Sequence, residues 1–268
     1  TAYEIRLSLV GSEMCIRDRK SSLIPYFARI GVRTGWLGEF RYGLLNDIRK
    51  LDPNRNHLMV EKFVSLSLKD INYSLESLDF PSLTIDLVNQ KNVLAKLSID
   101  SSLRSLAICP GAEFGPAKKW PPDYYAEVAR AYIERGWNIL CLGSPNDQET
   151  GEKIESFHDL NKENKFYNLI GKTSLNDAID ILDLCDRVVT NDSGLMHIAA
   201  AVGTPLVALY GPSSPAYTPP LTDNKKILRK MEGYEKKREG DLDRGYHQSL
   251  LAIKPTEVIN ALEEIQKL

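Results

Sequence analysis

The chain has 268 residues, of which 26% are charged and 43% hydrophobic, and its formal net charge is −2. This composition is typical of a folded globular protein and argues against extensive disorder. Because acidic and basic residues nearly balance, no overall positive field attracts nucleic acid, and we predict no nucleic-acid partner. No apolar run approaches the ~18 residues that span a bilayer, so membrane contact is expected only at the surface.

The cysteines and the start of the chain indicate where the protein works. No CxxC spacing occurs, and three of the four cysteines lie in or beside apolar patterns, so we predict buried thiols in a reducing compartment. They are Cys15, Cys109, Cys141 and Cys185. No charged-then-apolar start resembles a signal peptide, which favours a cytoplasmic location.

The first twenty residues, TAYEIRLSLVGSEMCIRDRK, differ from the rest of the chain. They follow neither the strand period of 2 nor the helix period of 3.6. The stretch LSLVGSEMCIRDR resembles translated sequencing-adapter read-through, so we predict that residues 1–20 are a non-native segment and that the true N-terminal part is missing. The alternative is an irregular strand and loop.

Residues 21–100 predict an incomplete α/β domain and a connection. The patterns favour a helix at 23–30, a short strand at 32–36 and a helix at 57–71. One strand among these helices is what remains of an α/β domain without its first βα units. From residue 73 to about 103 we expect an inter-domain connection, with one strand at 83–88.

Residues 101–254 predict a complete α/β domain in which five strands alternate with four helices. The strands are expected at 105–111, 137–144, 165–171, 186–192 and 204–213. The helices are expected at 121–136, 146–160, 174–185 and 193–203. Runs such as VVT and LVALY are apolar on both faces, which favours a parallel sheet covered on each side. A last helix is expected at 255–268.

The run NDSGLMH places polar residues where a predicted strand ends and a helix begins. At such a junction the first helical N–H groups lack internal partners and carry partial positive charge, which favours a phosphate. Gly194 lets a ligand approach the backbone, and His197 lies one turn after Ser193 on the same face. The alternative is simple helix capping by Asp192 or Ser193.

The run CPGAEFGPAKKWPPDYY leaves the first strand of the same domain through a loop with two glycines and two lysines. Such a loop suits an anion, although it lacks the spacing of a Walker loop and of GxGxxG. The alternative is an ordinary loop with solvated lysines. A helix N-terminus contributes only about 0.3–1 kcal/mol per charge, and catalysis needs about 8 kcal/mol or more, so a lysine aimed at the same phosphates is needed as well.

Several separated motifs resemble one known family. They are CPGAEFGPAKKWPPDYYAEVA, VVTNDSGLMHIAAAVGTPLVALYGPSSPAYTPP, RTGWLGEFRYGLLND and GYHQSL. Over residues 20–268 the chain resembles the ADP-heptose:lipopolysaccharide heptosyltransferases of glycosyltransferase family 9, and within them the heptosyltransferase II group. The resemblance implies an α/β, GT-B-like fold, with the ADP-sugar on a C-terminal Rossmann-like domain and a remnant of the N-terminal one on the acceptor side.

The resemblance also implies a reaction and its residues. Heptose would pass from ADP-L-glycero-D-manno-heptose to heptosyl-Kdo2-lipid A at the inner-membrane face, with inversion and without a metal or cofactor. Lys118 would stabilise the diphosphate leaving group. The donor would contact Gly111, Lys118, Asp192, Ser193, Gly194, Leu195 and His197, and the acceptor would contact Arg33, Trp36, Arg41 and Tyr42.

One departure from the family pattern affects the expected activity. The family's general-base aspartate lies in the first βα loop of the N-terminal domain, and this sequence has no matching segment. A proton acceptor contributes about 10²–10⁴ in rate, so we expect weak ADP binding and little turnover from this chain. The alternatives are another nucleotide-sugar enzyme, similar to a UDP-sugar epimerase, and an ADP-binding module without chemistry.

Two further stretches suggest weaker alternatives. DLD at 241–243 resembles the metal-binding DxD of other glycosyltransferases, but it lies in a charged stretch, so no metal site is predicted there. The basic run at 225–238 fits a solvated face or contact with acceptor phosphates at the membrane surface.

Overall fold

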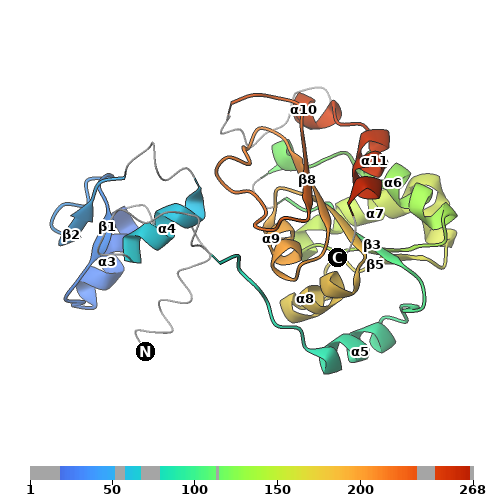
Figure 1. Cartoon of the computed structure of the whole chain (residues 1–268), viewed down its shortest axis with the longest axis horizontal. Helices are drawn as coiled ribbons and strands as arrows, with labels where there is room; N and C mark the ends of the chain where they lie inside the picture. Colours follow the sequence, from blue (N-terminus) through green and yellow to red (C-terminus); the bar gives the residue numbers. More distant parts are fainter. Residues whose placement is uncertain (1–18, 52–57, 68–78, 113–114, 234–244, 266–268) are drawn as a thin grey trace. The chain divides into compact units, whose positions relative to one another are not determined.

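The computed structural model describes residues 19–51, 58–67, 79–112, 115–233 and 245–265. Contacts divide the chain into a smaller unit, residues 1–78 with 216–218, and a larger unit, residues 79–215 with 219–268 (Figure 1). The larger unit therefore begins at Asp79, earlier than the predicted boundary at residue 101.

The smaller unit contains two helices and a two-stranded parallel sheet. The helices are α3 (Arg19–Phe27) and α4 (Met59–Ser67), and the strands are β1 (Thr34–Trp36) and β2 (Asp47–Arg49). The strands pair in register from Thr34 opposite Asp47 to Trp36 opposite Arg49. The sequence pattern predicted only the first strand. It missed β2 because three half-exposed residues show no hydrophobic alternation.

The helix predictions for this unit are close but shifted. α3 begins before residue 23 and ends at Phe27, whereas the pattern extended to residue 30. α4 lies inside the helix predicted at 57–71, of which residues 68–71 are outside the described part of the chain. Residues 1–18 are also outside it, so the prediction that this segment is non-native stays a prediction.

The larger unit is built on one parallel sheet of six strands. They are β3 (Ser105–Cys109), β4 (Asn138–Cys141), β5 (Phe166–Asn168), β6 (Arg187–Asn191), β7 (Leu206–Tyr210) and β8 (Lys225–Arg229). Their order is β5-β4-β3-β6-β7-β8, and every neighbouring pair is parallel. The five predicted strands and the parallel sheet are confirmed. In this arrangement the loops after β3, β4 and β6 leave the same edge of the sheet.

Helices cover both faces of this sheet (Figure 1). They are α5 (Leu87–Lys96), α6 (Pro122–Glu134), α7 (Gln148–Ser156), α8 (Leu175–Leu184), α9 (Gly194–Ala201), α10 (Gln248–Leu251) and α11 (Pro255–Glu264), with short 3₁₀ turns η2 (Pro116–Lys118), η3 (Pro145–Asp147) and η4 (Phe157–Lys162). One core lies between the sheet, α6 and α11, and the other between the sheet, α8 and α9. Alternate residues of each strand enter the two cores: in β3, Leu106 and Ile108 enter the first, and Ala107 and Cys109 the second.

Two elements of the larger unit differ from the sequence predictions. The strand expected at 83–88 is wrong, because Asp86 caps a helix there: its carboxylate accepts hydrogen bonds from the Val88 and Asn89 backbones, and α5 begins at Leu87. Gln90 and Val93 of α5 are then buried three residues apart. The other difference is β8, a strand that the sequence pattern did not predict. It forms within the basic run at 225–238 and pairs with β7. Its lysines hid the strand from a hydrophobicity pattern.

Three of the cysteines lie within the described residues. Cys109, Cys141 and Cys185 are buried free thiols, as predicted, while Cys15 lies outside the described residues. Burial raises the pKa of the Cys109 thiol well above its usual range, so it stays protonated. No helix in the described part of the chain is long and apolar enough to cross a membrane.

Candidate functional site

Two loops from neighbouring strands meet at the carboxyl edge of the sheet. β3 and β6 pair directly, and the loops that follow them carry Lys118 and Asp192. The Lys118 Nζ lies 2.6 Å from an Asp192 carboxylate oxygen, and the aspartate side chain is almost fully buried. The structure therefore brings together the two loops that the sequence analysis singled out, and their charges are paired.

The next lysine pairs in the opposite direction. Lys119 Nζ lies 3.0 Å from Asp147 Oδ1, at the start of the helical segment that follows β4. The other Asp147 oxygen accepts hydrogen bonds from the Ser144 backbone and hydroxyl at 3.2 and 2.8 Å. Two consecutive lysines thus bridge the β3 loop to the loops of both flanking strands. Sequence reasoning missed Asp147, although an acid at a helix start after the next strand is a usable signal.

Gly111 has a structural reason to be glycine. A Cβ at this position would lie 2.5 Å from the Asp147 Oδ2, a distance that real Cβ atoms do not adopt. The predicted donor-binding role of Gly111 is therefore not needed to explain the residue. Its bare backbone allows the β3 and β4 loops to approach each other.

Gly194, the first residue of α9, has no such reason. Its φ angle lies outside the left-handed region, and a Cβ would meet no atom within 4 Å. Glycine near a helix start gives less helix stability than most residues. Nothing in the fold of the larger unit therefore requires glycine here, and the space beside it is open.

The start of α9 is not capped by a side chain. Ser193 occupies the N-cap position, but its hydroxyl makes no capping hydrogen bond and lies 3.4 Å from the Thr190 hydroxyl. Within the described residues, neither the Gly194 nor the Leu195 N–H donates a hydrogen bond. The capping alternative is therefore wrong for Ser193. The helix presents free donors beside an exposed glycine.

His197 lies in the first turn of α9, with part of its surface open to solvent and the charges of Asp192 and Lys118 near the ring. Loss of hydration around the ring lowers the pKa of His197 below its ordinary value; the Asp192 charge opposes this shift, and the Lys118 charge adds to it. The imidazole is therefore neutral at pH 7. A neutral ring offers one hydrogen-bond donor and one acceptor beside the free amides of α9.

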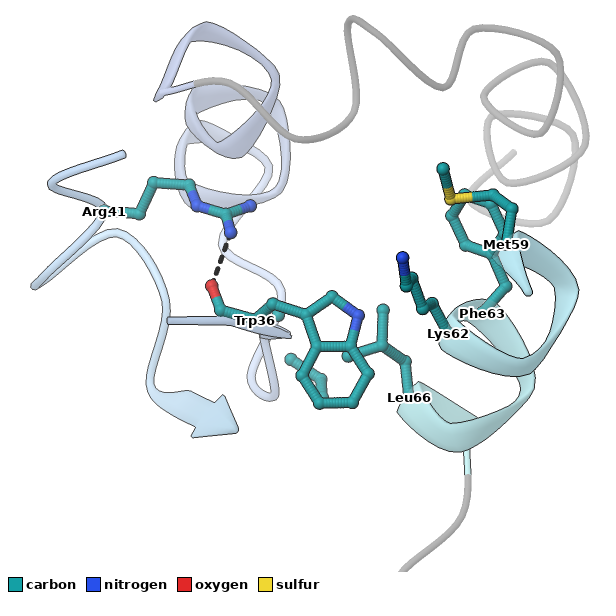
Figure 2. Close-up of a pocket in the computed structure, with 8 residues that line it drawn as sticks. Trp36, Arg41, Met59, Lys62, Phe63 and Leu66 are labelled. Carbon is teal, nitrogen blue, oxygen red and sulfur yellow. Dashed lines mark hydrogen bonds between the residues drawn. The ribbon is translucent and has the colours of Figure 1, made fainter. Parts of the chain in front are cut away.

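The smaller unit contains a pocket of about 60 Å³ between the β1–β2 region and α4 (Figure 2). It is lined by Thr34, Gly35, Trp36, Arg41, Met59, Lys62, Phe63 and Leu66. Trp36 is only 8% exposed, and Figure 2 shows its indole nitrogen on the side facing Lys62. Two of the four predicted acceptor residues, Trp36 and Arg41, thus lie at one pocket.

Arg33 and Arg41 also hold the local fold of the smaller unit, and Tyr42 lies outside the pocket. Arg33 donates to the backbone carbonyls of Leu44 and Ile30 at 2.6 and 2.7 Å, so it holds the local fold. Arg41 donates to the Trp36 carbonyl across the same turn. Tyr42 is 65% exposed, outside the lining of the pocket.

The weaker sequence signals concern a metal ion and the loop after β7. DLD at 241–243 lies outside the described residues. Among the residues that are described, no group of three or more His, Cys, Asp or Glu side chains is arranged to hold a metal ion. In the loop after β7, the buried Ser213 hydroxyl has no hydrogen-bond partner among the residues that the structure describes.

Comparisons with known proteins agree on one family. The model of glycosyltransferase family 9 (heptosyltransferase) matches residues 17–247. Lipopolysaccharide heptosyltransferase 2 of Escherichia coli K12 is 44% identical over 251 residues, which are 92% of this chain and 72% of that protein. Lipooligosaccharide heptosyltransferase 2 of Haemophilus influenzae is also 44% identical, over 92% of this chain and 73% of that protein.

Solved structures give the same result. The structure of E. coli ADP-heptose lps heptosyltransferase II matches with a TM-score of 0.80 and 42% identity, covering 91% of this chain and 72% of that chain. A heptosyltransferase from E. coli solved with ADP-2-deoxy-2-fluoro heptose has a TM-score of 0.56 at 20% identity, over 87% of this chain and 65% of that one. At this identity the match shows only that the two proteins share a fold.

Proposed function

Because this chain belongs to glycosyltransferase family 9, the heptosyltransferases, we propose that it transfers L-glycero-D-manno-heptose from ADP-heptose to the first heptose of the lipopolysaccharide inner core. Relatives that are 44–46% identical over 92% of the chain are lipopolysaccharide or lipooligosaccharide heptosyltransferases 2. Family membership and this identity favour heptose transfer over the epimerase alternative.

The observation that carries the donor assignment is the uncapped start of α9 beside Lys118. The Gly194 and Leu195 N–H groups are free within the described residues, and the open space at Gly194 admits an anion. We assign the diphosphate of ADP-heptose to these amides. Backbone donors and the helix dipole suit phosphate oxygens at such a position.

Lys118 would act on the leaving group. As the bond between the heptose and the diphosphate breaks, negative charge grows on the ADP oxygens, and an ammonium already in place stabilises it. Asp192 holds Lys118 at the sheet edge before the donor binds. The diphosphate would then share or replace this carboxylate as the partner of the lysine.

The proposed reaction inverts the anomeric centre and needs neither metal nor cofactor, because Lys118 and the helix amides supply the positive charge. His197, neutral at pH 7, would contribute a hydrogen bond rather than a charge. On this proposal, EDTA leaves the ADP affinity unchanged.

For the acceptor we propose the pocket of the smaller unit. Trp36 offers an indole N–H and an aromatic face, and Lys62 lies at the same pocket, which suits a sugar with acidic substituents. Heptosyl-Kdo2-lipid A has this chemistry, and its lipid would place the protein at the cytoplasmic face of the inner membrane. Arg41 would line the pocket with Trp36, Arg33 would support the local fold, and Tyr42 would lie outside the lining.

Donor binding is the sharpest test, because it is measured without turnover and so does not depend on a general base. Isothermal titration of the chain with ADP-heptose, ADP and UDP should give at least about tenfold tighter binding for the two adenine ligands, equivalent to ~1.4 kcal/mol. Equal or tighter binding of UDP would contradict the donor assignment and favour a uridine-sugar enzyme. No binding of any of the three would contradict a nucleotide site altogether.

A further inference from the structure

Asn191 is a buried amide at the corner between the two candidate phosphate-binding loops. It is the last residue of β6, fully buried, and it directly precedes Asp192. A buried amide needs partners for both of its polar atoms, since leaving them unpaired costs stability. The hydrogen-bond partners of Asn191 therefore indicate which segments its side chain holds in place.

The side chain of Asn191 bonds to both ends of the segment between β3 and α6. Its Nδ2 donates to the Pro110 carbonyl at 2.7 Å and to the Gly111 carbonyl at 3.5 Å. Its Oδ1 accepts from the Trp120 backbone N–H at 3.2 Å and from the Tyr125 hydroxyl at 3.0 Å. The amide orientation follows from these partners, because a reversed amide would set its NH₂ against the Trp120 N–H.

These bonds fix the position of Lys118. Pro110 and Gly111 begin the segment that carries this lysine, and Trp120 lies two residues after it. One side chain therefore sets both ends of the segment, and the same residue leads into Asp192, the partner of Lys118. The relation between the ammonium and the start of α9 depends on this amide.

From this geometry we infer that Asn191 is a positioning residue that holds Lys118 against the start of α9, ready for the donor diphosphate. This inference rests on the proposed function. Burial raises the pKa of the Tyr125 hydroxyl well above its usual range, so this group keeps its proton and remains a donor to Asn191.

The chain offers a matched control for a substitution at Asn191. Asn138 is also fully buried, but it begins β4 at the opposite edge of the sheet and donates to the Asp100 carbonyl at 2.6 Å. Asn191→Asp and Asn138→Asp are therefore the same chemical change at similar burial. The Asn138 Oδ1 has no hydrogen-bond partner within the described residues, so Asn138→Asp reports the effect of a buried carboxylate away from Lys118.

The first measurement needs no nucleotide. Acetylation of Lys118, followed by mass spectrometry, should be at least about threefold faster in Asn191→Asp than in the wild type, because the loop loses its anchor to the Pro110 carbonyl. In Asn138→Asp the rate should stay at the wild-type value. Equal rates in all three proteins would overturn the inference even if the chain binds no ADP.

The second measurement is ADP affinity by calorimetry. Asn191→Asp should weaken ADP binding about tenfold or more, and Asn138→Asp less than about threefold. In a Lys118→Met background the effect of Asn191→Asp should shrink to about threefold, because the lysine that it positions is gone. An undiminished effect in that background would contradict the inference.

A milder substitution covers the case in which Asn191→Asp fails to fold. Tyr125→Phe removes one of the two donors to the Asn191 Oδ1 and keeps the ring that packs on Trp120. It should raise Lys118 acetylation about twofold and weaken ADP about two- to threefold. No change in either quantity would also count against the inference.

Discussion

Two helices of the larger unit start in the same way in the sequence and differently in the structure. Both α8 and α9 have serine at the N-cap. In α8, the Ser174 hydroxyl accepts from the Asp177 backbone at 3.1 Å, and the Asp177 carboxylate accepts from the Ser174 backbone at 2.9 Å. In α9, Ser193 makes no such bond.

The difference is that side chains close the start of α8, whereas no side chain caps the start of α9. The capping box of α8 satisfies two backbone donors, one at each end of the box. Within the described residues, the first two N–H groups of each helix donate no hydrogen bond, but only at α9 does an exposed glycine lie there, with Lys118 close to Asp192. A bare helix start next to a lysine is therefore the feature that separates a binding site from an ordinary turn.

The largest expected effect comes from placing an acid at the start of α9. Gly194→Asp should weaken ADP binding on the order of a hundredfold, because the carboxylate repels the phosphates and fills their space. Stability should not fall, since an acid at a helix N-terminus adds about 0.3–1 kcal/mol and replacing glycine also helps. Leu175→Asp, at the exposed first residue of α8, is the control and should leave ADP affinity unchanged. Calorimetry and thermal denaturation measure both quantities.

The next effect separates the two consecutive lysines. Lys118→Met should weaken ADP binding about ten- to thirtyfold, as expected for the loss of a charged hydrogen bond. Lys119→Met also removes a lysine from an ion pair with a buried aspartate, but that pair faces the β4 loop, so the affinity should change less than about threefold. Equal losses in the two variants would mean that the diphosphate lies between the lysines rather than at α9.

Removing each N-cap hydroxyl should have opposite consequences. Ser174→Ala should lower the free energy of unfolding by about 1 kcal/mol and leave ADP binding unchanged, because its hydroxyl caps α8. Ser193→Ala should change stability by less than about 0.5 kcal/mol but weaken ADP about threefold. Urea denaturation measures the stability, and calorimetry measures the ADP affinity. A larger loss of stability in Ser193→Ala than in Ser174→Ala would contradict this difference between the two helix starts.

The smallest effect is a pH dependence from His197. Its folded pKa lies below the unfolded value of 6.5, so the unfolded chain binds more protons between the two values, and stability is lost as the pH falls through this window. His197→Gln should remove that loss. The denaturation midpoints of the two proteins should therefore diverge on acidification from about pH 7.5 to about pH 5.5, with the wild type losing more. A constant difference would show that the imidazole is not shifted.

The regular part of the fold could be predicted because its strands are apolar on both faces. Runs such as VVT and LVALY point to a buried parallel strand whatever surrounds them. β8 could not be found in this way, since Lys225 and Lys226 interrupt the apolar pattern, and their ammonium groups contact the Thr222 carbonyl and Glu264. α5 was misread because Asp86 stops an apparent alternation and begins a helix, and that depends on its carboxylate meeting two backbone N–H groups.

The site was predictable in its location and less so in its contacts. Parallel strands bring their carboxyl ends to one edge, so Lys118 and Asp192 could be expected to lie close together. Sequence spacing could not show that they form an ion pair, or that Asp147 makes Gly111 necessary. These contacts depend on the relative positions of three loops, which only the folded sheet determines.

The central claim is that ADP binds at the uncapped start of α9. Backbone amide NMR of the nitrogen-15-labelled chain during an ADP titration tests it most directly, with the capped start of α8 as an internal reference. Binding there should give saturable shifts of the Gly194 and Leu195 amide signals and none at Leu175 or Asn176. Saturable shifts elsewhere, with the Gly194 and Leu195 signals unmoved, would contradict it.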